Sequence, residues 1–383
     1  MAAASGARFP SAWMAGVRLR VDPRYAPTLA TIALFVGMVV VGSLRFPNFL
    51  SAQVFLNLLI DHSFLLVVAV GMTFVIISGG IDLSVGAVVA LAMILSAKLL
   101  RQGWNPALVV ALVLTLGFLY GSAQGLLIQY FDIQPFIATL AGMIFARGLC
   151  YVTSLDSIPI RDSLYTAASQ TRIGLFFVRT PDYHYYGTVL VPVRDAFVSP
   201  AVVIALLVVV IAFVVLHYSR FGRTVYAIGG NESSAVLMGL AVPRTKVLVY
   251  AISGLCSATG GILWNVYSLS GFPRAGIGME LDAIAAVVVG GALLTGGYGY
   301  VLGSVVGVLI LGLVQTFIEF DGTLSSWWTK IFIGGLLLVF ILVQRLLSRR
   351  TLRLPRSRRV RAAPSPPLVE QAAVEQAAVE RPT

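Results

Sequence analysis

The chain has 383 residues, of which 58% are hydrophobic and 11% carry a charge. A soluble domain carries about 25% charged residues, so this composition excludes an ordinary water-soluble fold and predicts a membrane protein. The net charge of +11 comes from basic residues at the two ends of the chain and between its apolar segments, a distribution that indicates membrane topology rather than nucleic-acid binding.

Ten apolar segments follow one another along the chain. They cover residues 26–43, 54–77, 85–99, 107–130, 136–153, 200–217, 247–270, 283–294, 300–319 and 329–343. A spanning helix needs about 20 apolar residues, and the third and eighth segments are short by that measure. Only helices and closed barrels satisfy every backbone group in lipid, and these segments are too long for barrel strands. We therefore expect an all-α integral membrane protein with about ten transmembrane helices.

The positions of Lys and Arg predict the orientation, because basic residues gather on the cytoplasmic side. Ten crossings with both termini in the cytoplasm put most basic clusters there, although Arg45, Lys98 and Arg101 then fall outside. The predicted parts are a cytoplasmic N-terminal arm (1–25), a transmembrane domain (26–347) with an external loop (155–199) and a cytoplasmic loop (219–246), and a cytoplasmic tail (348–383). The tail is basic and then rich in Pro, Ala and Glu, a composition typical of disorder.

A weak internal repeat relates two glycine-containing segments. Residues 77–89 align with residues 294–306, so that Gly79, Gly80 and Gly86 fall on Gly296, Gly297 and Gly303. In the predicted topology both segments follow an outward-to-inward helix, which makes the repeat parallel, and many transporter folds carry the substrate path between such halves. The alternative is that glycine-rich membrane helices simply look alike, and the sequence leaves both interpretations open.

The first of these segments interrupts an apolar stretch with two adjacent glycines and a carboxylate. Gly79 and Gly80 break a helix or let backbones approach closely, which favours a broken-helix element beside a pathway through the membrane. Asp82, near the predicted membrane boundary, is interpreted instead as a cap on the helix that begins near Ser84, within an interfacial turn.

Arg147 is a charged residue inside the fifth apolar segment. It lies about two turns from the predicted outer end, at about 1.5 Å per residue, so its side chain can snorkel to the surface. It can equally form an internal ion pair or donate to a substrate, and the sequence does not choose between these alternatives.

The cytoplasmic loop contains a predicted short helix. Asn231 is a capping residue at its start, Glu232 is favourable in its first turn, and Gly239 is suited to end it. Such an amphipathic helix can dock in a groove of a cytoplasmic protein or rest on the membrane surface. Composition alone leaves both interpretations open.

Nothing in the sequence indicates covalent chemistry. Cys150 and Cys256 lie in apolar segments and are expected to be packing residues, and His62, His184 and His217 are far apart. The sequence has no HExxH motif, no paired CxxC motif and no phosphate-binding P-loop. We therefore expect no catalytic residue, no metal site and no cofactor.

Four ordered motifs give the chain a resemblance to a known family. They lie at 71–86, at 135–143 with Arg147 and Gly148, at 222–231 with 238–240, and at 280–291 with 295–299. They resemble the signatures of the ribose-type sugar permeases of bacterial ATP-binding-cassette importers, over about residues 28–347. Within that family, Ser157-Ile-Pro-Ile and residues 320–330 look most like the galactofuranose permeases. Ribose-type members usually have Asn-Gly-Leu near the second of these segments, where this chain has Asp321-Gly-Thr, and this difference disfavours ribose.

The resemblance implies a translocation subunit rather than an enzyme, moving a monosaccharide, with galactofuranose as a candidate, by alternating access. The implied partners are cytoplasmic ATPase subunits, an external sugar-binding protein and a second permease subunit, which is either identical or different. The implied location is the lipid bilayer of a bacterial inner membrane. No nucleic acid is expected as a partner. The implied ATPase-coupling residues are Asn231, Glu232, Ser233, Ser234, Val236, Leu237, Gly239 and Leu240. The pathway candidates are Gly79, Gly80, Asp82, Ser84, Thr139, Arg147, Gly296 and Gly297.

Two other classes of transporter remain as alternatives. A secondary, ion-coupled transporter requires carboxylates within the membrane as an ion relay, whereas the carboxylates of this chain are predicted near the ends of spans. They are Asp61, Asp82, Asp132, Glu280, Asp282 and Glu319. An importer permease of the branched-chain amino acid type shares the general architecture of the sugar permeases, and the four motifs match the sugar side more fully.

Overall fold

The structure is a computed structural model, and it describes residues 26–174, 184–186, 189–191, 196–325 and 327–351. The chain divides into two units, 1–344 and 345–383, and the second is described only at 345–351, where it continues a helix. The predicted N-terminal arm, and the predicted tail beyond residue 351, lie outside the described residues.

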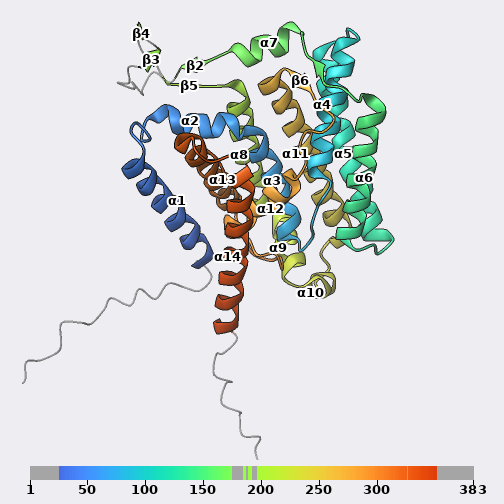
Figure 1. Cartoon of the computed structure of the whole chain (residues 1–383). Helices are drawn as coiled ribbons and strands as arrows, with labels where there is room; N and C mark the ends of the chain where they lie inside the picture. Colours follow the sequence, from blue (N-terminus) through green and yellow to red (C-terminus); the bar gives the residue numbers. More distant parts are fainter. Residues whose placement is uncertain (1–25, 175–183, 187–188, 192–195, 326, 352–383) are drawn as a thin grey trace, which may run out of the picture. The chain divides into compact units, whose positions relative to one another are not determined.

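Helices make up most of the described chain (Figure 1). In chain order they are α1 (Ala26–Arg45), α2 (Ala52–Asp61), α3 (Ser63–Ile77), α4 (Val85–Arg101), α5 (Pro106–Tyr130), α6 (Pro135–Thr153), α7 (Ser163–Gln170), α8 (Pro200–Tyr218), α9 (Arg220–Gly230), α10 (Glu232–Leu237), α11 (Val242–Ser268), α12 (Met279–Val289), α13 (Val301–Asp321) and α14 (Trp327–Thr351). Three short antiparallel pairs join β1 (Ile158–Pro159) to β6 (Ser270–Gly271), β2 (Ile173–Gly174) to β5 (Phe197–Val198), and β3 (His184–Tyr186) to β4 (Val189–Val191).

The all-α membrane architecture expected from the sequence is confirmed. Within the described ranges, six helices are long and apolar enough to span a membrane, namely α1, α5, α6, α8, α11 and α13, and the bent pair α2–α3 makes a seventh if it is counted as one span. The three other predicted segments correspond to α4, α12 and α14. Every apolar segment predicted from the sequence therefore contains a helix.

Two of the predicted spans differ from the structure. The segment predicted as one helix at 54–77 consists of α2 and α3, which meet at His62 with a bend of 62°. The segment predicted at 283–294 is α12, which begins earlier, at Met279, and has 11 residues. At about 1.5 Å per residue, α12 is about half as long as a membrane-spanning helix.

The core is built around α3 and α11. Every residue of α3 except Phe64 is buried, as expected for a helix that is apolar on all sides. α11 packs against α3, α4 and α5. Gly117, Gly121 and Gly125 form a row along α5, and a Cβ atom at Gly121 would overlap the Tyr250 carbonyl oxygen of α11. Small residues at this spacing let membrane helices approach closely.

The outward surfaces of α5, α6 and α8 are apolar. Leu119, Phe145 and Leu207 are each more than half exposed on these helices. Large exposed apolar side chains in this number indicate a surface that faces lipid rather than water. The fold thus presents its outer helices to the bilayer and keeps α3 and α11 inside.

Candidate functional site

A cavity of about 630 Å³ opens where α2 bends into α3. Residues of α11, α12, α13 and α14 complete its wall. The polar side chains that line it are Asp61, His62, Asp282, Gln315, Glu319, Thr329 and Lys330, and the aromatic ones are Phe64, Trp264 and Tyr267. Carboxylates, an amide, an amine and aromatic rings therefore share one space, which we call the polar cavity.

The polar cavity holds its side chains in defined positions. The rings of Phe64 and Trp264 stack with centroids 4.5 Å apart and an angle of 9° between their planes. Tyr267 Oη donates to Asp61 Oδ1 at 3.2 Å. An aromatic pair offers an apolar surface, and the adjacent carboxylate oxygens accept hydrogen bonds. This combination suits a neutral ligand that has both apolar faces and hydroxyl groups.

An ion pair closes the side of the polar cavity formed by α14. Lys330 Nζ donates to Asp282 Oδ2 of α12 at 2.6 Å. On α13, Gln315 Nε2 donates to Glu319 Oε1 at 2.9 Å. Both contacts involve side chains that are partly exposed, so the groups remain accessible to a ligand.

Sequence reasoning did not identify this cavity. It treated Asp61, Asp282 and Glu319 as separate carboxylates near span ends, and none of the eight pathway candidates lines the polar cavity. The signal in the sequence was that aromatic and polar residues gather at one end of several helices, for example Trp264 and Tyr267 near the end of α11. These residues form a site only because the tertiary structure brings the ends of those helices together.

Three of the pathway glycines, Gly79, Gly296 and Gly297, lie instead at a second position together with Gly229 of α9. We call this position the glycine junction and define it by these four residues. Gly297 N donates to the carbonyl oxygen of Ile77, the last residue of α3, at 2.8 Å. A Cβ atom at Gly229, in α9, would overlap that same carbonyl oxygen. The end of α3, the end of α9 and the turn between α12 and α13 therefore meet in backbone contact.

The two segments of the predicted repeat lie side by side in the glycine junction. A Cβ atom at Gly296 would be 2.8 Å from the Gly79 nitrogen. Both glycines have positive φ angles, of 85° and 82°, which only glycine adopts readily. Each follows a helix that runs from the polar cavity to the junction, α3 in one case and α12 in the other, as a parallel repeat requires.

A tyrosine fixes α9 at the junction. Tyr226 Oη donates to the Gly299 carbonyl oxygen at 2.6 Å. Burial raises the pKa of the Tyr226 phenol above its ordinary value, because desolvation disfavours the phenolate. The phenol therefore keeps its proton and remains a donor at neutral pH.

Asp82 is buried against neighbouring helices, whereas the sequence prediction placed it in an interfacial turn. Its side chain is 1% exposed. Its Oδ1 atom accepts from Ser84 N at 2.9 Å and from Ser84 Oγ at 2.7 Å, and its Oδ2 atom accepts from Ser253 Oγ of α11 at 2.7 Å. It thus orders the turn before α4 and ties that turn to α11 inside the protein. The N-cap position of α4 is Ser84, and no side chain caps the helix there.

The rest of the segment at 78–84 is held by neighbouring helices. Thr139 Oγ1 of α6 donates to the Ile81 carbonyl oxygen at 3.3 Å. Ser84 Oγ lies 3.1 Å from Gln124 Oε1 of α5. The structure therefore brings Thr139, Asp82 and Ser84 together around one buried turn.

Arg147 lies apart from that turn. The sequence left open whether its side chain snorkels to the surface or points inward, and its contacts favour the inward position. Its Nη1 atom donates to the carbonyl oxygens of Pro273 and Ala275, at 3.0 and 2.8 Å. The side chain is internal and does not snorkel. These carbonyls belong to the segment that leads into α12, so Arg147 holds the entry to this short helix.

The predicted short helix of the cytoplasmic loop is present as α10, with the predicted caps. Asn231 Oδ1 accepts from Ser234 N at 2.8 Å, and Gly239 follows the helix with a φ angle of 73°. Glu232 Oε1 pairs with Lys246 Nζ of α11 at 2.5 Å. Leu237 is 89% exposed. α10 is therefore a fixed element with an apolar tip that no other described part of the chain covers.

Comparison with known proteins identifies relatives of this architecture. Residues 54–341 match the family model described as "Branched-chain amino acid transport system / permease component". The chain is 46% identical over 323 residues to the inner membrane ABC transporter permease protein YjfF of Escherichia coli K12, covering 84% of this chain and 92% of that protein. It is 39% identical to the fructose import permease protein FruG of Bifidobacterium longum, covering 85% and 92%, and 39% identical to the ribose import permease protein RbsC of Bacillus subtilis, covering 82% and 91%. No solved structure matches the chain.

Proposed function

Because this chain belongs to the family of permease components described for branched-chain amino acid transport systems, we propose that it is the permease subunit of an ATP-driven importer and that its substrate is a monosaccharide. The observation that carries the choice of substrate is the polar cavity. A sugar ring presents apolar faces and hydroxyl groups, and the cavity offers the Phe64–Trp264 stack beside the Asp61 carboxylate.

The named relatives support the same class of substrate. Two of them carry fructose and ribose in their names, and a third, 31% identical, is the galactose/methyl galactoside import permease protein MglC of Salmonella typhimurium. The resemblance of Ser157-Ile-Pro-Ile and of residues 320–330 to galactofuranose permeases makes galactofuranose the first sugar to test.

We infer that α10 is the contact for a cytoplasmic ATPase. Its fixed attachment through the Glu232–Lys246 pair and its exposed Leu237 support this assignment, because a rigid helix with an apolar tip fits a groove on a partner. The coupling set at 231–240 would then lie on the cytoplasmic side. Ten crossings would put both termini on that side as well.

The glycine junction offers a route from α10 to the polar cavity. α10 follows directly after α9, whose last turn places Gly229 against the end of α3 and the turn between α12 and α13. α3 and α12 both reach from the junction to the polar cavity, where Phe64 and Asp282 line the wall. A displacement of α10 would therefore reach the wall of the cavity through two rigid helices, which is the requirement for alternating access.

The remaining parts of the proposal concern partners. An external binding protein would deliver the sugar to the end of the molecule that carries the polar cavity, opposite to α10. A second permease subunit, identical or different, would complete the translocation unit in the bacterial inner membrane. The chain itself would carry no catalytic residue.

The test is transport by the full chain in proteoliposomes. The permease is reconstituted with the ATPase and binding protein that copurify with it, and the uptake of labelled galactofuranose, ribose, fructose and leucine is compared with and without ATP. We expect ATP-dependent uptake of a sugar and none of leucine. Uptake by the chain alone under an ion gradient would establish the secondary transporter instead, and uptake of leucine alone would establish the amino acid type.

A further inference from the structure

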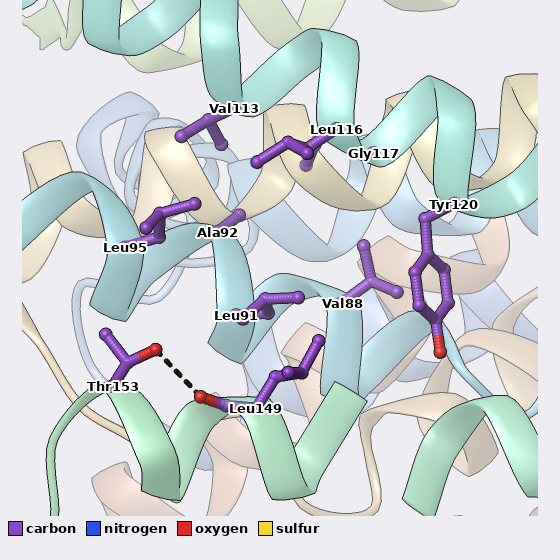
Figure 2. A pocket seen from close by; sticks show the side chains of 11 residues that line it. Val88, Leu91, Ala92, Leu95, Val113, Leu116, Gly117, Tyr120, Leu149 and Thr153 are labelled. Atoms are coloured by element: carbon purple, nitrogen blue, oxygen red, sulfur yellow. Dashed lines mark hydrogen bonds between the residues drawn. The ribbon is translucent and has the colours of Figure 1, made fainter. Parts of the chain in front are cut away.

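A second cavity lies between α4, α5, α6 and α11 and has a volume of about 270 Å³. Figure 2 shows Leu91 and Leu95 of α4, Leu116 of α5 and Leu149 of α6 facing the same space. It shares no lining residue with the polar cavity, so the proposed transport function does not account for it. We call it the apolar cavity.

The apolar cavity offers almost nothing to a polar ligand. Its two side chains with hydroxyl groups already donate within the protein, Thr153 Oγ1 to the Leu149 carbonyl oxygen at 2.7 Å and Tyr120 Oη to the Gly142 carbonyl oxygen at 2.5 Å. A buried water needs two to four polar partners, whereas an apolar cavity of about 150 Å³ stays dry and binds benzene. The apolar cavity is therefore suited to hydrocarbon.

Hydrocarbon is available on the open side of this cavity. Leu116, in its wall, is 44% exposed, and Leu119, further along the same helix, is 55% exposed. Both lie on the part of α5 that faces the bilayer. The acyl chain of a lipid can therefore enter the cavity from the membrane without crossing water.

A cationic group lies at the rim of the apolar cavity. Leu91, Leu95 and Lys98 follow at helical spacing on one face of α4, and Lys98 Nζ donates to the Thr153 carbonyl oxygen at 3.1 Å. Thr153 is itself a lining residue. Arg101 lies one turn further, exposed at the end of α4, and among the residues described neither cation forms an ion pair.

We propose that the apolar cavity is a binding site for one anionic phospholipid, whose acyl chain fills the cavity and whose phosphate group contacts Lys98 and Arg101. The hydrocarbon end and the charged end of such a lipid match the two ends of this site. The site also gives a reason for Lys98 and Arg101 to lie at a membrane end where the positive-inside rule does not expect them.

The charge half of the site is tested by lipid binding to the purified full chain. Native mass spectrometry measures the binding of palmitoyl-oleoyl phosphatidylglycerol and of the zwitterionic phosphatidylcholine with the same chains. We expect tighter binding of phosphatidylglycerol, and we expect Lys98→Gln to lower it roughly fivefold, the effect of one basic residue near an anionic group. Arg45→Gln, at the exposed end of α1, is the matched control and leaves binding unchanged.

The hydrocarbon half is tested by filling the cavity. Leu116→Trp fills the cavity from its open side and lowers binding of both lipids, whereas Leu119→Trp adds the same ring on α5 outside the cavity and does not. Equal binding of both lipids by the wild-type chain would overturn the proposal. Equal lipid binding by the two tryptophan variants would also overturn it. So would a result in which Leu116→Trp binds lipid normally but no longer gives the mass of a dimer, because the cavity would then belong to an interface between two copies of the chain.

Discussion

Asp82 is a buried carboxylate in a protein that spans a membrane, and within the described residues it accepts its hydrogen bonds from two serines. Its two oxygens accept three hydrogen bonds, from Ser84 N, Ser84 Oγ and Ser253 Oγ. This arrangement explains how the carboxylate is tolerated inside the protein, where a buried polar group without hydrogen bonds is costly. It also makes the residue a positioning element for the turn before α4 rather than a member of an ion relay.

The positioning role predicts different results for two substitutions of Asp82. Asp82→Asn keeps the acceptor for Ser84 N and can donate to Ser253 Oγ, so we expect nearly wild-type stability and transport. Asp82→Ala leaves buried groups without partners and should cost about 1–3 kcal/mol in the free energy of unfolding. Thermal unfolding in detergent and sugar uptake measure the two effects, and loss of uptake in Asp82→Asn at unchanged stability would show that the charge itself is needed.

Trp264 is the residue of the polar cavity whose removal tests recognition most directly. Its stack with Phe64 provides the apolar wall, and an aromatic contact of this kind is worth about 1 kcal/mol. We expect Trp264→Ala to raise the KM for sugar uptake roughly fivefold at this energy, and Trp264→Phe to restore most of the loss. Trp104→Ala, at an exposed tryptophan between α4 and α5 that lines neither cavity, should leave KM unchanged.

At the scale of elements, the glycine junction predicts a contrast between neighbouring residues of α9. A Cβ atom at Gly229 would overlap the Ile77 carbonyl oxygen, whereas a Cβ atom at Gly230 would have nothing within 4 Å. Gly229→Ala must push α9 away from α3, and we expect it to lower ATP-driven uptake strongly. Gly230→Ala makes the same chemical change without the overlap and should transport normally. Equal uptake by the two variants would mean that the junction does not transmit motion.

The tip of α10 gives a second prediction at this scale. Leu237 is 89% exposed, and Leu155, which follows α6 at the other end of the transmembrane helices, is 76% exposed. We expect Leu237→Asp to insert and fold normally, because neither contacts nor burial are lost, but to lose the ATPase in copurification and to stop importing. Leu155→Asp is the matched control and should keep both. Retention of the ATPase by Leu237→Asp would assign α10 to the membrane surface instead.

For the whole molecule, the proposed orientation has both termini in the cytoplasm. The reason is that basic residues gather at both ends of the chain and beside α10. Reporter fusions at residues 20 and 360, two positions that the structure does not describe, are expected to give a cytoplasmic signal. A signal from the outside at either end would contradict the ten-crossing arrangement and require one span, most simply the short α12, to turn back within the membrane.

The elements of this protein were predictable from its sequence because each depends on local chemistry. Long apolar segments determine where helices lie, and the cap and stop of α10 follow from Asn231 and Gly239. The family resemblance likewise rests on four local motifs in a fixed order. The bend at His62 escaped prediction because no proline or glycine there marks it.

The functional geometry was decided only by the tertiary structure. The polar cavity joins Asp61, Trp264, Asp282 and Glu319, which are separated by up to 258 residues in the sequence, and no local pattern links them. Arg147 could snorkel or turn inward with the same local sequence, and the nearby carbonyl oxygens of Pro273 and Ala275 make the inward position favourable. The apolar composition of a segment predicts that it forms a membrane helix. Because lipid solvates every apolar face of such a helix equally well, only packing against particular neighbouring helices determines which helix ends meet to form a site.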